Sequence, residues 1–155
     1  MLFRSEYVPF AEQLPWLARI TPIGAGIAAG KRAEAFSIRG FWVSPSICFE
    51  STVPHLIRRQ VKQLVTEGKS PDVLINLTND GWFWGSSILD MHFHCAVFRA
   101  VENRRPVLIA ANTGISGWID ASGKVVARAE RRRAAAIIAS ISPNRHETIY
   151  TQWGD

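Results

Sequence analysis

The stretch that most constrains the fold of this chain is a short, nearly continuous apolar run at Val73–Leu77. Such a run, followed at once by the turn residues Asn79-Asp80-Gly81, is typical of a β-strand that is buried on both faces. Residues Pro106–Ala111 repeat the pattern. The chain therefore contains strands of the kind found in layered α/β domains.

Helical patterns lie between these strands. We expect helices at about Pro54–Glu67 and Ser87–Asn103, and in the second helix Cys95 falls on the predicted buried face and is expected in the core. That face comprises Ile88, Met91, Cys95, Phe98 and Val101. Further strands are expected at Ala35–Ile38, Phe41–Ile47, Ala134–Ile141 and, as a hairpin, at Ile115–Ile119 and Val125–Ala129. Strands that alternate with helices indicate an α/β fold with a sheet extended by the late hairpin.

Composition and charge narrow the class of protein. A chain of 155 residues with 47% hydrophobic and 20% charged residues is an ordinary folded domain, or part of one. Its net charge of +5 includes a block formed by Arg128 and residues 131–133. Such a block attracts phosphate groups or forms a solvated edge, and we favour the edge because no aromatic residues interleave with it. No nucleic-acid partner is therefore expected.

Membrane, export and metal signals are weak in this sequence. No apolar run approaches the roughly 18 residues that a membrane helix needs, and Met1 does not open a signal-peptide pattern. Cys48 and Cys95 show no metal-ligand spacing, and His92 and His94, two residues apart, point to different sides of a helix. We therefore expect neither a metal nor a cofactor.

Cys48 ends the apolar run that opens with Phe41, and a helical pattern starts soon after it, near Pro54. Strand, cysteine, turn and helix is a geometry that lifts a nucleophile off the edge of a sheet, where a substrate reaches it. The alternative is that Cys48 is a small buried apolar residue, as free cysteines usually are.

Two more polar loops bear on that choice. Asn79-Asp80 and Asn112-Thr113-Gly114 each follow a buried strand, and sites in such sheets form where the carboxyl ends of strands meet. Cys48 would lie at the same edge. Trp82, Phe83 and Trp84 follow the first of these loops, and they either line a pocket or cover the edge of the core.

Four segments resemble the nitrilase (carbon–nitrogen hydrolase) superfamily, and within it they are most similar to the catalytic domain of apolipoprotein N-acyltransferases. The segments are Ile47–Glu50, Asn76–Phe83, Arg99–Pro106 and Asn112–Ser116. Val8–Glu12 and the closing Trp153–Asp155 agree with that branch, so the resemblance covers nearly the whole chain.

The resemblance implies a nitrilase-like α-β-β-α sandwich, of which this chain would form part, and a glutamate–lysine–cysteine catalytic set. Cys48 would be the nucleophile, with Glu12 and Glu50 as carboxylates that support the site. The thiolate would take a fatty acyl group from a phospholipid and pass it to the N-terminal amine of a lipoprotein. Phe49, Trp82 and Phe83 would bind substrate. The family works without a cofactor, on the periplasmic side of the bacterial inner membrane.

The chain also departs from the family. The catalytic lysine is expected a little upstream of Val8–Glu12, and by simple register that position is Arg4, a possible cation for the oxyanion. Alternatively, the register is disturbed and the lysine precedes Met1. The family's first catalytic glutamate and its membrane helices find no counterpart, so we expect residues 1–155 to be the C-terminal part of a carbon–nitrogen hydrolase domain. We expect the isolated chain to be inactive or nearly so.

Two other functions stay open at this point. One is a nitrilase-type amidase that hydrolyses a small amide with the same catalytic logic. The other is a remnant that folds or docks on a partner without chemistry, which an unreactive, fully buried Cys48 would favour.

Overall fold

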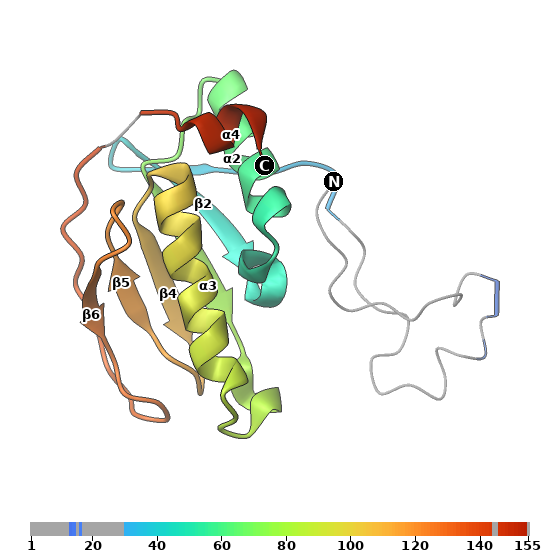
Figure 1. Cartoon of the computed structure of the whole chain (residues 1–155), viewed down its shortest axis with the longest axis vertical. Helices are drawn as coiled ribbons and strands as arrows, with labels where there is room; N and C mark the ends of the chain where they lie inside the picture. The colour runs from blue at the N-terminus through green and yellow to red at the C-terminus, as the bar shows by residue number, and fades with distance from the viewer. Residues whose placement is uncertain (1–12, 15, 17–29, 144–145, 155) are drawn as a thin grey trace. The chain divides into compact units, whose positions relative to one another are not determined.

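A six-stranded mixed sheet, in the order β1-β2-β3-β4-β5-β6, carries the described part of the chain (Figure 1). The computed structural model describes residues 13–14, 16, 30–143 and 146–154. Residues 33 onward form one compact unit. Its elements are β1 (Phe36–Ile38), β2 (Phe41–Ile47), the 3-10 helix η1 (Cys48–Thr52), α2 (Pro54–Thr66), β3 (Val73–Thr78), the 3-10 helix η2 (Asp80–Phe83), α3 (Ile88–Asn103), β4 (Val107–Ala111), β5 (Gly117–Ile119), β6 (Val125–Arg128) and α4 (Ile149–Trp153).

The middle of the sheet is parallel. β2 pairs with β3 and β3 with β4 in parallel, and the crossovers between them contain α2 and α3. Because the three strands run the same way, their carboxyl ends lie at one edge of the sheet. The outer strands pair antiparallel, and β1 turns into β2 at Arg39-Gly40, where both residues have positive φ (52° and 85°). A two-residue hairpin turn with this backbone matches the twist of the strands that it joins.

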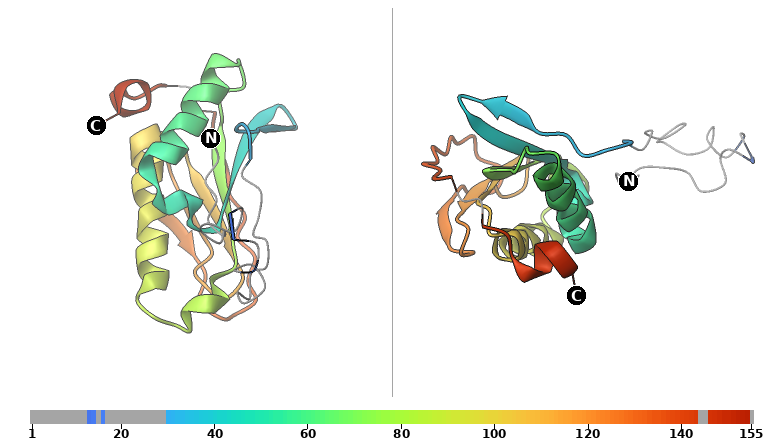
Figure 2. Two further views of the ribbon diagram at one scale, coloured as in Figure 1. Left: turned by 90° about the vertical axis from the view of Figure 1, so that its right-hand side faces the viewer. Right: turned by 90° about the horizontal axis from the view of Figure 1, so that it is seen from above.

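Helices α2 and α3 cover one face of the sheet, as the side view of Figure 2 shows. The hydrophobic core lies between them and the strands, and burying each large aliphatic side chain there contributes about 1.5–3 kcal/mol to folding. Its members are Ile57, Val61, Leu74, Phe93, Ala96, Ala100, Val107, Ile109, Ile115 and Ile119. This arrangement confirms the predicted α/β fold.

The sheet's other face is apolar but less buried. Side chains alternate along β2 and β3, so Ser44, Ser46 and Asn76 turn to the helices while Ile47 and Leu77 turn away. Ile47 and Leu77 pair in the register of the two strands and are 53% and 47% exposed. In an α-β-β-α sandwich this is the face on which the second sheet packs, so the exposed apolar row fits the expectation that the chain forms part of a sandwich.

The predicted buried face of α3 is wrong. Met91 and Phe98 are 58% and 62% exposed and Cys95 is only half-buried, whereas Phe93, Ala96 and Ala100 face the core. The helix carries two apolar stripes, and the stripe with alanines lets the backbone approach the sheet closely. Buried polar partners for His92, Arg99 and Asn103 then keep that side inward.

The strand predicted at Ala134–Ile141 is also wrong. These residues are described but belong to no helix or strand, and Ile138 is 91% exposed. A strand needs a neighbour that accepts its backbone hydrogen bonds, and within the described part of the chain the sheet ends at β6. Apolar composition alone does not supply that neighbour.

The exposed apolar face predicts self-association. The double substitution Ile47→Lys and Leu77→Lys is expected to weaken concentration-dependent association of the chain at least several-fold, because two charges replace apolar surface on an unpaired sheet face. Sedimentation velocity over a concentration series measures the effect. The matched control is Met91→Lys with Phe98→Lys, which adds the same charge on α3. Equal weakening by both pairs would assign the effect to net charge instead.

Candidate active site

Three loops converge at the carboxyl edge of the parallel strands. Cys48 follows β2, Asn79 and Asp80 follow β3, and Asn112 follows β4. The Asn112 backbone N–H donates to the Thr78 carbonyl (3.0 Å), and its side-chain amide donates to Asn79 Oδ1 (3.1 Å). The predicted meeting of these loops at one edge is therefore confirmed.

Cys48 begins η1 in a left-handed backbone conformation, with φ of 50°. This conformation is uncommon for a residue with a Cβ atom, and such outliers concentrate at functional sites. The residue is half-buried, so it is not the fully buried core cysteine of the alternative interpretation.

Glu50 closes the turn around Cys48. One oxygen of its carboxylate accepts the Ile47 backbone N–H at 2.8 Å, so the side chain folds back onto the residue before the cysteine. The contact stabilises the first turn of η1 in the manner of a helix-capping carboxylate. Glu50 thus lies beside Cys48, where the sequence placed it, and it contacts the backbone of the turn.

The aromatic residues of this edge divide into two groups. The rings of Phe49 and Phe83 lie 5.2 Å apart, and Phe49 also stacks on His92 at 5.1 Å. Trp82 is 72% exposed, so it does not cover the core edge. Phe49 and Phe83 therefore form a packed aromatic wall next to Cys48, and Trp82 lies free for contact with another molecule.

A chain of buried polar groups runs beneath the nucleophile loop. The Ser51 hydroxyl lies 2.9 Å from His92 Nε2, and His92 Nδ1 lies 3.1 Å from Asp80 Oδ1. Asp80 also accepts the Thr78 hydroxyl at 2.7 Å. Burial acts to raise the pKa of Asp80, but the hydrogen bonds from His92 and Thr78 and the charge of His92 together hold it below its usual value. Asp80 is therefore ionised at neutral pH.

Sequence reasoning missed this chain of groups. It considered His92 only as a metal ligand together with His94; in the structure His92 is buried and His94 exposed. The available signal was that Asp80 and His92 sit on either side of the aromatic loop, in segments that meet at the strand ends.

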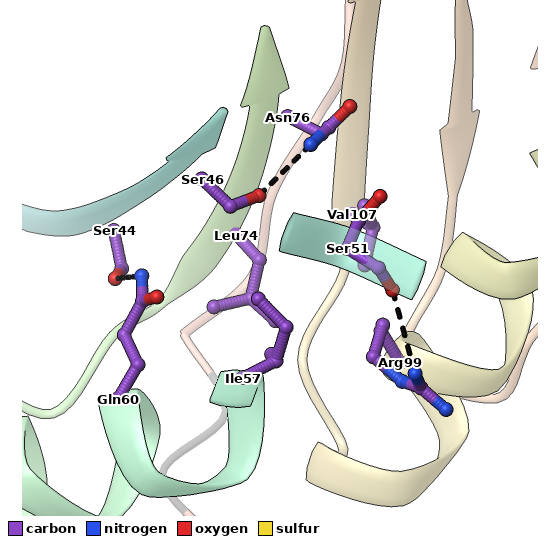
Figure 3. Close-up of a pocket in the computed structure, with 9 residues that line it drawn as sticks. All are labelled: Ser44, Ser46, Ser51, Ile57, Gln60, Leu74, Asn76, Arg99 and Val107. Carbon is purple, nitrogen blue, oxygen red and sulfur yellow. Dashed lines mark hydrogen bonds between the residues drawn. The ribbon is translucent and has the colours of Figure 1, made fainter. Parts of the chain in front are cut away.

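A small polar cavity lies between the sheet, α2 and α3 (Figure 3). Ser46, Asn76 and Ser51 line it, and the Arg99 guanidinium donates to the Ser51 carbonyl across it (3.4 Å). The same guanidinium binds Glu102 through two hydrogen bonds of 2.7 and 2.6 Å. The cavity has about 10 Å³ of free volume, whereas substrate sites span roughly 300–1,000 Å³. Substrate must therefore approach Cys48 from the exposed edge.

The arginine block contributes to surface ion pairs. Arg128 and Arg131 both contact the Asp90 carboxylate, and Arg133 contacts Glu130 at 2.6 Å. These pairs match the solvated edge that we favoured for the block.

Other predicted features lie elsewhere. Arg4 and Glu12 fall outside the described residues, so their roles stay predictions. Among the described residues, no group of three potential metal-ligating side chains occurs, and no helix is long and apolar enough to cross a membrane.

Residues 3–150 match the carbon–nitrogen hydrolase family. The chain belongs to this family. The predicted membership of the nitrilase (carbon–nitrogen hydrolase) superfamily is thereby confirmed, and the match includes Cys48 and all three converging loops.

Curated relatives agree in name. A protein of Rhodopirellula baltica is 36% identical over 152 residues, covering 97% of this chain and 27% of the relative. One of Thermotoga maritima is 37% identical over 164 residues, covering 99% and 31%. Both are named apolipoprotein N-acyltransferase. The chain thus spans less than a third of the length of these relatives.

Solved structures share the fold. An amidase from Nesterenkonia sp. superposes with a TM-score of 0.53 at 15% identity, over 84% of this chain and 47% of the amidase. A Saccharomyces cerevisiae member of the nitrilase superfamily gives 0.53 at 19% identity, over 68% and 40%. These likenesses place the sheet and its helices in the nitrilase fold.

Gly114 leaves the space that Asp80 occupies. A Cβ atom at residue 114 would lie 2.0 Å from Asp80 Oδ2, so Gly114→Ala is expected to displace the carboxylate and lower the free energy of unfolding by about 1–3 kcal/mol. Urea unfolding measures the loss. In the control Gly81→Ala, the new Cβ would meet only the end of the Asn79 side chain at 3.2 Å. An equal effect of both substitutions would contradict the packing argument.

The lowered pKa of Asp80 predicts a dependence of stability on pH. Because the folded pKa lies below the ordinary value of 3.8, the unfolded chain takes up the proton first as the pH falls. Asp80 therefore stabilises the fold above about pH 4 and loses this effect as the pH falls through its folded pKa. Chemical unfolding at a series of acidic pH values should show a shallower loss for Asp80→Asn than for the parent chain. Parallel curves would contradict it.

Proposed function

We propose that this chain carries the nucleophile of an N-acyltransferase, Cys48, which accepts a fatty acyl group as a thioester and passes it to the N-terminal amine of a lipoprotein. One observation carries the proposal: relatives with 28–37% identity over nearly the whole chain are named apolipoprotein N-acyltransferase. The phospholipid donor, and action on the periplasmic side of the bacterial inner membrane, are part of the same proposal.

The chemistry takes place in two half-reactions. In the first, the Cys48 thiolate attacks the ester carbonyl of the phospholipid, the thioester forms, and the lysophospholipid alkoxide leaves and takes up a proton. In the second, the lipoprotein amine attacks the thioester, the amide forms, and the amine proton passes to a base while the thiolate is released. Glu12 is the proposed base and Arg4 the proposed cation for the oxyanion.

The surroundings of Cys48 support this chemistry. The residue lies at the exposed edge of the sheet, next to the aromatic wall of Phe49 and Phe83, and apolar aromatic surface suits an acyl chain. The exposed indole of Trp82 suits the boundary between lipid and water, because tryptophan combines an apolar ring with a polar N–H group. Glu50 supports the turn through its contact with the Ile47 N–H.

Cysteine chemistry of this kind has a parallel in the fold. The Nesterenkonia amidase carries the product of acrylamide addition at its active-site cysteine. By analogy of fold, we propose that residues 1–155 correspond to the part of the hydrolase domain that contains the nucleophile.

The first test is labelling of the native chain with iodoacetamide, read by mass spectrometry. Cys48 is expected to react at least about ten-fold faster than it would as an unactivated thiol of equal exposure, for which Cys95 on α3 provides the internal reference. Cys48→Ala should abolish the fast reaction, and Cys95→Ala should leave it unchanged. Fast labelling that persists in Cys48→Ala would remove Cys48 from the site.

A second measurement separates the candidate reactions. Vesicles of phosphatidylethanolamine with a labelled acyl chain are expected to leave a hydroxylamine-sensitive label on Cys48 in a single turnover, which does not require the full reaction cycle. A label from a small amide but none from phospholipid would point to an amidase. A native Cys48 that reacts with neither, and labels only after denaturation, would point to a non-catalytic role.

A further inference from the structure

The backbone carbonyl of Cys48 lies within hydrogen-bond reach of three different side chains. Asn76 Nδ2 donates to it at 3.0 Å, His92 Nε2 lies 3.2 Å from it, and the Ser51 hydroxyl lies at 3.3 Å. A peptide carbonyl has two lone pairs, so this one is fully supplied by side chains alone. The three groups come from β3, α3 and η1, which are separate in sequence and meet under the nucleophile loop.

Each of these groups is itself held in place. The Asn76 amide also donates to the Ser46 hydroxyl (3.0 Å), and His92 Nδ1 lies against Asp80, which Thr78 holds from the other side. Asn76, His92 and Asp80 are at most 5% exposed. Satisfied buried networks of this kind fix one geometry, because any displacement leaves a polar group without its partner.

The network tolerates either protonation form at His92 Nε2. With Asp80 ionised, Nδ1 carries the proton that faces it. A hydroxyl both donates and accepts, so Ser51 pairs with Nε2 in either form of the ring, and Asn76 supplies the Cys48 carbonyl throughout.

The order Ser51–His92–Asp80 resembles a hydrolytic triad, but burial excludes that role here. All three side chains are at most 5% exposed, and the Phe49 ring stacks over His92. Both ring nitrogens already have protein partners, so no nitrogen of His92 is directed to a substrate. What the group touches is the backbone of the nucleophile.

That backbone needs support. Cys48 has a positive φ without being a glycine, and such a conformation persists only where surrounding contacts determine it. A carbonyl fixed on one side of the peptide sets the direction of the Cα–Cβ bond on the other.

We propose that His92, Asp80 and Asn76 are positioning residues: through the Cys48 carbonyl they hold the cysteine in its left-handed conformation and so fix the direction of its thiol. The inference rests on the proposed function, in which Cys48 is the nucleophile. It assigns these residues no contact with the substrate. His92 acts at one end of the network and Asp80 orients its ring.

The chain offers a direct readout, because it contains only two cysteines. Labelling the full chain with 13C-cysteine gives signals from Cys48 and Cys95 alone, and their Cα and Cβ chemical shifts report backbone conformation. Cys95 lies on α3 one turn beyond His92, so its signals show whether that helix stays folded. A Cys95→Ser sample assigns the two sets.

The matched variants are His92→Gln and His92→Asn. The glutamine amide reaches the position of Nε2 and keeps a donor for the Cys48 carbonyl, whereas the asparagine amide reaches only the position of Nδ1. With His92→Asn, Cys48 signals are expected to move toward values of extended backbone and alkylation of Cys48 to slow about ten-fold. With His92→Gln, both are expected to stay near the parent values.

Three outcomes would overturn the proposal. Cys48 signals could keep parent values in both variants, or move equally in both while Cys95 is unchanged, which would assign the effect to ring packing. If His92→Asn does not fold, Ser51→Ala tests the same carbonyl by removing one hydroxyl, and unmoved Cys48 signals then count against it. Failure of the proposed function is a different result: a parent Cys48 that does not label in the native chain.

Discussion

The parallel register of β2, β3 and β4 is the constraint on which the rest of the site depends. It pairs Ile47 with Leu77 and Thr78 with Ala111, so all three strands end at the same level. The residue after β2 is then the nucleophile candidate, and the loops after β3 and β4 bring Asp80 and Gly114 beneath it. A shift of one residue in either pairing would turn Asn76 to the opposite face of the sheet and remove its contact with the Cys48 carbonyl.

Polar residues occupy the space between sheet and helices where an apolar core would pack more simply. Ser46, Asn76, Asp80, His92 and Arg99 are all buried there. Burial of such groups is costly when any partner is missing, and a satisfied set gives geometric definition more than net stability. The hydrophobic cluster around Val61 and Phe93 supplies the folding free energy, while the polar set determines where the loop after β2 lies. Stability and site geometry are thus assigned to neighbouring but different residues.

The sequence predicted the elements and their edge, and physical reasons explain the rest. The runs at Val73–Leu77 and Pro106–Ala111 are unambiguous because few structures bury such residues on both sides. α3 was harder, because its apolar residues form two stripes and only the contacts of buried His92 decide between them. Ala134–Ile141 has strand composition but no partner strand among the described residues. Partners far apart in sequence, such as Asp80 with His92, require knowledge of which segments meet.

The two kinds of residue around Cys48 differ in what they can change without loss of the fold. Phe49 belongs to both sides: one face of its ring stacks on buried His92, and its other neighbour is Phe83 in the loop after β3. Its packing therefore couples the backbone network to the surface where an acyl chain would lie. Trp82, with no such packing, is exposed at the same edge. Substrate contacts can vary there, because the nucleophile's conformation is set from below, by groups that a substrate does not touch.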